Sequence, residues 1–189
     1  MKFILTFLLL LPVFVKAETE APEALIQKIF ILAQKENVMN NLEVKRELDS
    51  HFDFQKMSLK ILGDEAQKRS AADLKWFEES IKEIITKTVY PKAPEFLKGV
   101  KITYKNTLID EGKATVPSVV AKKGEKTDVN YSLIKSGQSW KVIDIAIDDE
   151  SWVKTINEKM TKTLKEKGWV GVKDMINKRV KALNTKKKA

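Results

Sequence analysis

The sequence contains no cysteine, a single histidine, five prolines and seven glycines. Without cysteine the chain can form no disulfide, no thiolate zinc site and no cysteine nucleophile. One histidine, His51, leaves little material for a histidine-rich metal site or a histidine-based catalytic triad. The sequence also lacks the patterns of phosphate-binding loops, dinucleotide-binding folds, serine hydrolases and zinc proteases. We therefore expect no catalytic residue, no metal and no cofactor.

The apolar content is nevertheless that of a folded protein. Apolar residues make up 43% of the 189 residues, and the few prolines and glycines argue against a disordered or collagen-like chain. This length suggests one domain. Because disulfides are excluded, its stability has to come from a hydrophobic core.

Residues 1–17 have the pattern of a secretory signal peptide. Lys2 gives a positive start, a mostly apolar run covers 3–15, and Val15 and Ala17 occupy the two positions that define a cleavage site. At ~1.5 Å per residue the run spans about 20 Å, which is short of the ~30 Å hydrocarbon core of a bilayer. The sequence thus predicts cleavage after Ala17 and export, which in a Gram-negative cell means the periplasm.

The net charge of +9 is concentrated towards the ends of the chain. Loss of the signal peptide, with its two lysines, lowers it to +7. Residues 178–189 hold six basic residues and no acid, which leaves +1 for residues 18–177. We therefore divide the mature chain into a domain over 18–183 and a basic tail over 184–189. The tail is either solvated or in contact with anionic lipid headgroups, and export argues against nucleic acid as a partner.

Apolar residues recur at helical spacing in the first half of the chain. The pattern predicts one helix with Pro22 in its first turn and two shorter helices over 41–50 and 53–62. Ser70 predicts the N-cap of a long helix that continues to the prolines at 91 and 94, which stop or kink it.

Between residues 100 and 147 the apolar period changes to two, which predicts four strands joined by short turns. Pro117 predicts that the second of these strands lies at an edge or contains a bulge. The acidic cluster at 148–150 is interpreted as the start of a helix that ends at Gly168, and a last helix reaches about Leu183. The order of elements predicts an α+β fold, with helices covering one face of a four-stranded antiparallel curved sheet.

Asp144 lies on an otherwise apolar strand, and a buried carboxylate needs partners. It is either hydrogen-bonded for structural reasons or placed in a pocket that raises its pKa. In the second case it would be the candidate base of a small pocket enzyme, although no polar partner for such a reaction can be identified.

Two separated segments carry recognisable motifs. The first has Ile61-Leu62-Gly63 before a helix that opens at Ser70-Ala71-Ala72; the second has Trp140-Lys141-Val142-Ile143-Asp144, with Gly168 before a last amphipathic helix. In this order and spacing they resemble the MlaC family of phospholipid-binding proteins, also called toluene-tolerance auxiliary proteins. That family typically shows V-L-G, a helix opening near A-T-P, and a W-x-V-Y-D strand. Ile143 replaces its usual tyrosine and Asp149 a later glycine. The resemblance covers residues 22–183.

The resemblance implies a soluble periplasmic carrier rather than an enzyme. Such proteins ferry phospholipid between an outer-membrane lipoprotein complex and an inner-membrane ABC-transporter complex with an MCE-domain ring, which maintains outer-membrane lipid asymmetry. We expect a monomer whose helices and sheet enclose an apolar pocket. Two alternatives stay open, a small pocket enzyme and an envelope adaptor that binds no lipid.

A lipid carrier has to shield acyl chains from water. Two chains hold roughly 30 methylenes at about 0.8 kcal/mol each, so exposure of both would cost on the order of 20 kcal/mol. Alternation identifies a buried face but does not distinguish a pocket from a filled core; the resemblance favours the pocket. We predict a sheet wall of Ile102, Tyr104, Tyr131, Leu133 and Val142, and a helical wall and entrance of Phe77, Ile81, Ile85, Trp152, Ile156 and Met160.

Overall fold

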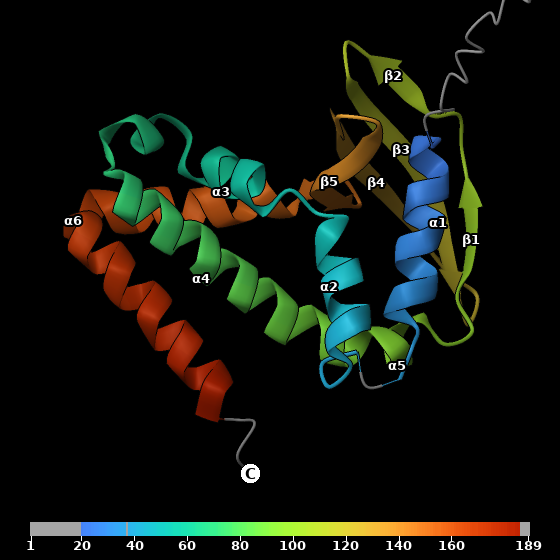
Figure 1. Ribbon diagram of the computed structural model, residues 1–189, viewed down its shortest axis with the longest axis horizontal. Helices are drawn as coiled ribbons and strands as arrows, with labels where there is room; N and C mark the ends of the chain where they lie inside the picture. The colour runs from blue at the N-terminus through green and yellow to red at the C-terminus, as the bar shows by residue number, and fades with distance from the viewer. Residues whose placement is uncertain (1–19, 37, 186–189) are drawn as a thin grey trace, which may run out of the picture.

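The computed structural model describes residues 20–36 and 38–185 (Figure 1). The predicted signal peptide and residues 186–189 of the basic tail lie outside these ranges. In the described residues, no helix combines the length and the apolar character needed to cross a bilayer.

Helices make up the first half of the chain, as the apolar spacing predicts. They are α1 (Pro22–Ala33), α2 (Leu42–Ser50), α3 (Phe54–Leu62), α4 (Ala71–Val89) and the short α5 (Ala93–Leu97). Side-chain oxygens of Asn41, Asp53 and Ser70 accept hydrogen bonds from backbone N–H groups in the first turns of α2, α3 and α4. These caps satisfy donors that a helix start leaves without partners, which is why the three helices begin where they do.

Six strands form one antiparallel sheet in the order β1-β3-β4-β5-β6, and β2 also pairs with β3. Their bounds are β1 (Lys101–Tyr104), β2 (Leu108–Asp110), β3 (Lys113–Lys122), β4 (Glu125–Ser136), β5 (Ser139–Ile147) and β6 (Glu150–Ser151). The predicted fold class is confirmed. The number of strands differs from four because the first predicted strand is divided into β1 and β2, and because β6 adds a short pair with β5.

Pro117 lies in the middle of β3, which is an interior strand and not the predicted edge strand. Its carbonyl oxygen accepts a hydrogen bond of 2.8 Å from the backbone N–H of Lys105, just beyond the end of β1. The proline nitrogen faces the same side, where β1 has ended and β2 has not begun. The missing N–H therefore falls at a gap in the neighbouring strand, where an interior strand tolerates proline.

The acidic cluster forms a turn and a strand instead of the predicted helix start. Asp148 and Asp149 have φ values of 47° and 65°, and this tight turn leads from β5 into β6. The helix begins afterwards, with the Ser151 hydroxyl accepting a hydrogen bond from the N–H of Lys154. Acidic residues at this place thus build a hairpin, and the serine supplies the cap.

The last helical segment, α6 (Trp152–Thr185), is broken at Gly168, where φ is 63° and ψ is −168°. This confirms Gly168 as the predicted end of a helix. We call residues 152–167 the first arm and residues 169–185 the second arm. The second arm includes Lys178, Arg179 and Lys181 and ends at Thr185, two residues beyond the predicted end of the last helix at about Leu183.

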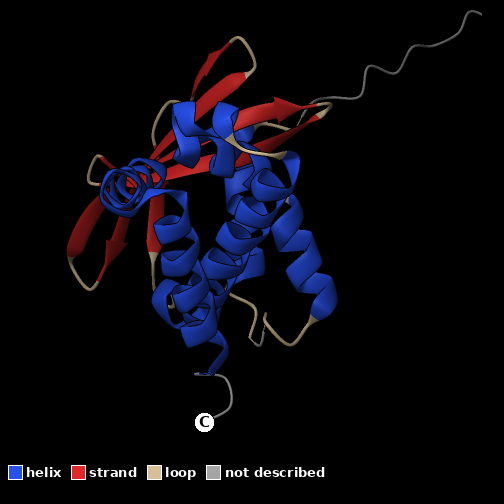
Figure 2. Ribbon diagram, turned by 90° about the vertical axis from the view of Figure 1, so that its left-hand side faces the viewer, coloured by secondary structure: helices blue, strands red, loops and turns tan. Residues whose placement is uncertain are grey.

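The helices lie together on one side of the curved sheet (Figure 2), and buried side chains form three clusters. The sheet core lies between the strands and helices α1 and α3. The helical core lies among α3, α4 and α6. A third, smaller cluster joins α1, α2 and the end of α4, and contains Leu32, Leu48 and Tyr90.

Candidate functional site

The predicted sheet wall lies in the sheet core. Tyr131, Leu133 and Val142 are buried, and Ile102 and Tyr104 are partly buried against them. The side chains that cover this wall come from α1 and α3; they are Leu25, Ile26, Phe54 and Met57. In addition, the ring of Phe30 stands edge-on to the ring of Tyr131, with centroids 6.1 Å apart.

The predicted helical wall lies in the helical core. Phe77, Ile81 and Met160 are buried there, and Ile156 packs against them. Phe77 is completely buried, and its ring lies 6.2 Å from the ring of Trp169 on the second arm of α6. The wall residues from α4 and from the first arm of α6 thus meet within one cluster.

The two cores meet at Ile85 of α4, which packs against both. Helix α3 also belongs to both, with Phe54 on the sheet side and Ile61 on the helical side. The structure therefore brings ten of the eleven predicted residues into two adjoining apolar clusters instead of around one chamber. The exception is Trp152, which belongs to neither cluster.

Trp152 lines an open groove of about 590 Å³ beside the start of α6. Ile156 also reaches this groove, whose remaining lining residues are Ile147, Asp148, Glu150 and Thr155. Two carboxylates make the groove unlike the apolar cores. Ile156 belongs to both the groove and the helical core, whereas Trp152 lies in the groove alone.

The sheet core contains phenol groups that stay uncharged. Burial raises the pKa of Tyr131 above its ordinary value, and burial raises the pKa of Tyr104 to about 12. A buried Ser118 hydroxyl donates a hydrogen bond of 3.1 Å to the carbonyl oxygen of Val129. This wall is therefore apolar with a few neutral polar atoms, which is compatible with hydrocarbon but not with a charged group.

Asp144 has the structural role that the sequence left open. Its Oδ1 accepts hydrogen bonds from the backbone N–H groups of Ile145 at 2.8 Å and Val153 at 3.2 Å, and its Oδ2 accepts one from the Ser151 hydroxyl at 2.6 Å. The carboxylate thus connects β5 to the beginning of α6, near the positive end of the helix dipole. A carboxylate held by three donors is poorly placed to remove a proton from a substrate.

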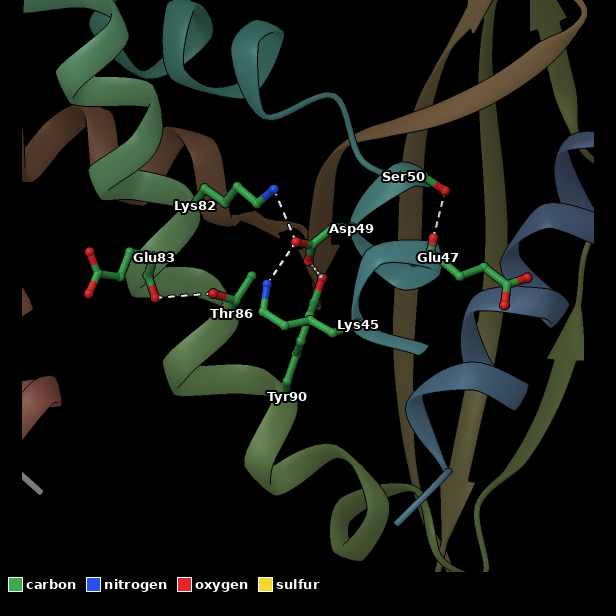
Figure 3. Close-up of polar contacts among 8 residues, drawn as sticks. All are labelled: Lys45, Glu47, Asp49, Ser50, Lys82, Glu83, Thr86 and Tyr90. Atoms are coloured by element: carbon green, nitrogen blue, oxygen red, sulfur yellow. Dashed lines mark hydrogen bonds and ion pairs between the residues drawn. The ribbon is translucent and has the colours of Figure 1, made fainter. Parts of the chain in front are cut away.

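Asp49 is the centre of a polar cluster that sequence reasoning missed (Figure 3). Its Oδ2 lies 2.8 Å from Nζ of Lys45 and 3.0 Å from Nζ of Lys82, and its Oδ1 accepts a hydrogen bond of 2.9 Å from the hydroxyl of Tyr90. Burial alone would raise the pKa of Asp49, but the hydrogen bonds from Lys45, Lys82 and Tyr90 lower it overall. The cluster joins α2 to α4, and Lys82 Nζ also lies 5.2 Å from the centre of the Phe54 ring.

No local signal identifies this cluster, because Lys82 and Tyr90 lie more than 30 residues from Asp49 in the sequence. His51, close by, is partly buried, and burial together with the charge of Lys28 lowers its pKa. Its carbonyl oxygen accepts a hydrogen bond from Val142, which attaches the α2–α3 connection to β5. Among the described residues, no group of three or more histidine and acidic side chains lies close enough to hold a metal ion.

The comparisons with known proteins agree with this architecture. The family model described as MlaC protein matches residues 24–178, most of the chain. The chain belongs to the MlaC family. A search of curated proteins finds no match.

Solved structures share the fold of this MlaC family member. One of them is a phospholipid-binding protein from Ralstonia solanacearum, in complex with a phospholipid, and it is 17% identical in sequence with a TM-score of 0.73. The likeness covers 86% of the present chain and 96% of the other. At this identity the likeness demonstrates a shared fold, while the residues that contact a ligand have to be argued from the chain itself.

Proposed function

We propose that this MlaC family member is a phospholipid carrier that holds the acyl chains between its sheet core and its helical core. The observation that carries the proposal is the meeting of two apolar clusters at Ile85. Family membership and the fold shared with a phospholipid-bound protein support it. Transfer involves no chemical step, and the headgroup stays in contact with water.

Helix α3 and the Ile85 side chain lie between the two walls and cover them. Each wall is apolar, so exposure of either to water is unfavourable at roughly 25 cal/mol per Å². When acyl chains enter, they replace the contacts that the walls make with α3 and at Ile85. The gain is large, because two exposed chains would cost on the order of 20 kcal/mol in water.

Helix α4 and the second arm of α6 are expected to move as a unit when the walls separate. Nζ of Lys173 on the second arm lies 2.5 Å from Oδ1 of Asp73 at the start of α4. Near the other end of α4, Lys87 donates a hydrogen bond to the side chain of Asn184. The sheet wall, in contrast, is held by continuous backbone hydrogen bonds along β3, β4 and β5. Separation between the cores breaks no pairing between strands.

The cellular role follows from the resemblance and from the predicted signal peptide. We infer that the protein acts in the periplasm after cleavage behind Ala17. There it would shuttle phospholipid between an outer-membrane lipoprotein complex and an inner-membrane ABC-transporter complex with an MCE-domain ring, and so maintain outer-membrane lipid asymmetry.

The test is mass spectrometry of lipid extracted from the purified mature protein, with delipidated and reloaded protein as reference. The variant Ile85→Asp places a carboxylate where the two cores meet, and we expect it to lose most of the bound phospholipid. The matched control is Ile109→Asp, since Ile109 is 61% exposed on β2 and contributes to neither core. Circular dichroism establishes that both variants are folded.

Two results would contradict the proposal. One is the absence of phospholipid from wild-type protein that has been reloaded under native conditions, which would favour an adaptor role. The other is equal lipid content in folded Ile85→Asp and in wild type, which would remove the acyl chains from the region between the two cores.

A further inference from the structure

The positive charge of the described protein is carried by a single helix. Residues 20–151 contain 21 basic and 22 acidic residues, whereas α6 contains nine basic and three acidic residues. Helix α6 therefore has a net charge of +6 on a body that is otherwise close to neutral. Half of this charge comes from Lys178, Arg179 and Lys181, which were counted above with the basic C-terminal residues, and the other half comes from residues 152–177.

The basic residues of α6 lie on its outer side. The inner side holds Val153, Met160, Val172 and Ile176, which are buried against α3 and α4. The exposed basic residues of both arms are Lys154, Lys159, Lys162, Lys165, Lys167, Lys178, Arg179 and Lys181. In the described part of the chain, Lys173 is the one basic residue of α6 that has an acidic partner within 4 Å.

Two exposed apolar side chains lie just beyond the break at Gly168, which we call the elbow of α6. Val170, two residues after Gly168, is 72% exposed, and Met175 is 38% exposed. Lys165 and Lys167 precede the elbow on the first arm. The second arm runs along the outside of the helical half, away from β1 (Figure 1). The acids of α6, Glu158, Glu166 and Asp174, are too few to neutralise the helix.

We propose that the outer side of α6 docks on the surface of an anionic phospholipid bilayer. Eight of its nine basic residues are lysines, which act as point charges towards a diffuse negative surface. Protein interfaces are instead depleted of lysine and centred on aromatic or arginine anchors. The exposed side chains of Val170 and Met175 are enough to contact the headgroup region of a bilayer but too few to insert the helix into it. The docked surface goes beyond the proposed lipid-binding interior and does not depend on it.

The experiment measures binding of the full mature protein to vesicles by co-sedimentation. Vesicles of equal parts phosphatidylglycerol and phosphatidylcholine are compared with vesicles of phosphatidylcholine alone, at low and at physiological salt. We expect binding to the anionic vesicles only, and weaker binding at the higher salt because screening shortens the range of the attraction.

Two matched variants distinguish an effect of the α6 lysines from an effect of the net charge of the protein. The first replaces Lys162, Lys165, Lys178 and Lys181 with glutamine; the second replaces the exposed strand lysines Lys101, Lys113, Lys126 and Lys135 with glutamine. Both lose four charges and keep residues 186–188. We expect the α6 variant to bind anionic vesicles about tenfold or more weakly, and the strand variant to stay within about twofold of wild type.

Equal losses in the two variants would overturn the proposal, because net charge alone would then explain the attraction. Failure of wild type to bind anionic vesicles at low salt would also overturn it, and would leave an acidic protein as the partner that fits α6. Lipid extracted from the α6 variant is measured in parallel. If the α6 variant binds vesicles weakly but retains its phospholipid, docking of α6 and lipid binding in the interior are independent properties.

Discussion

The sheet core and the helical core contain similar residues but are held together by different interactions. In the sheet, β3 pairs with β4 over ten successive residue pairs from Lys113 to Lys122, so neighbouring elements share backbone hydrogen bonds. In the helical core, each helix satisfies its own backbone. Contacts between α3, α4 and α6 are therefore made by side chains such as Phe77 and Met160.

This difference indicates which half can open. Strands cannot separate without leaving backbone groups unpaired, and each such group is expensive to bury. Helices can separate and lose only apolar contacts, which an acyl chain can replace. The sheet wall is thus the fixed side of the proposed binding site, and α4 with the second arm of α6 is the adjustable side.

The largest expected effect comes from breaking the helical core. Phe77→Ala removes a completely buried ring, and we expect the free energy of unfolding to fall by about 3–5 kcal/mol. Urea unfolding of lipid-free protein measures it. Native-state hydrogen exchange should show α4 opening at a lower free energy than β3 and β4 in wild type. A loss below about 1 kcal/mol would mean that Phe77 already borders open space without lipid.

The second prediction breaks the connection between the halves. Asp144→Ala removes the acceptor for Ile145, Val153 and Ser151. Because these donors are left without partners, we expect a loss of about 2–3 kcal/mol in unfolding free energy. Ser151→Ala, which removes the cap on Lys154 and one of the three donors to the carboxylate, should cost about 1 kcal/mol. Equal effects in the two variants would mean that the hydrogen bonds from Ile145 and Val153 to the carboxylate contribute nothing to stability.

The third prediction concerns the elbow of α6. Gly168 has a φ of 63°, which a residue with a Cβ adopts poorly, although beyond the adjoining backbone no described atom lies within 4 Å of the place where the Cβ would be. Gly168→Ala should therefore cost about 1–3 kcal/mol through the backbone alone. The neighbouring control Val170→Ala, on an exposed side chain, should stay within about 0.5 kcal/mol. Thermal unfolding of both variants provides the measurement.

The smallest expected effect is a change in the slope of stability against pH. The pKa of Asp49 is lower in the folded protein than its ordinary value of 3.8. Its contribution to stability is therefore complete above pH 3.8 and is lost as the pH falls through the lower folded value. Asp49→Asn should flatten the decline of stability in acid, as measured by urea unfolding from pH 5 downwards. An unchanged slope would contradict the role of the Lys45–Lys82–Tyr90 cluster.

Local signals in the sequence were sufficient for much of the fold. Ser70 caps α4 and Gly168 ends a helix because both act through their own backbone neighbourhood. The edge position predicted from Pro117 was wrong because the effect of a proline depends on the neighbouring strand. Here Pro117 faces the gap between β1 and β2, where no strand residue needs an N–H from this position. The division into β1 and β2 was missed for the same reason: pairing with β3 decides which residues count as strand.

The two buried faces were predictable from the sequence, but their arrangement relative to each other was not. Alternation identified Tyr131, Leu133 and Val142 as one buried face, and helical spacing identified Phe77 and Ile81 as another. Neither the strand period nor the helical period identifies which element packs against a buried face. The position of α3 between the two walls could therefore not be inferred. The Asp49 cluster was inaccessible because its partners come together only through the tertiary fold.

The elbow at Gly168 also has a consequence for how this protein can change in evolution. One residue inserted into a continuous α-helix rotates everything beyond it by about 100° and would turn a buried face towards solvent. At Gly168 the helix is already interrupted, so the rotation of one arm about its helix axis does not fix the rotation of the other. Either arm can gain or lose length beside the elbow while Met160 and Ile176 keep facing the core. Length changes in α6 among relatives should therefore gather at this one position.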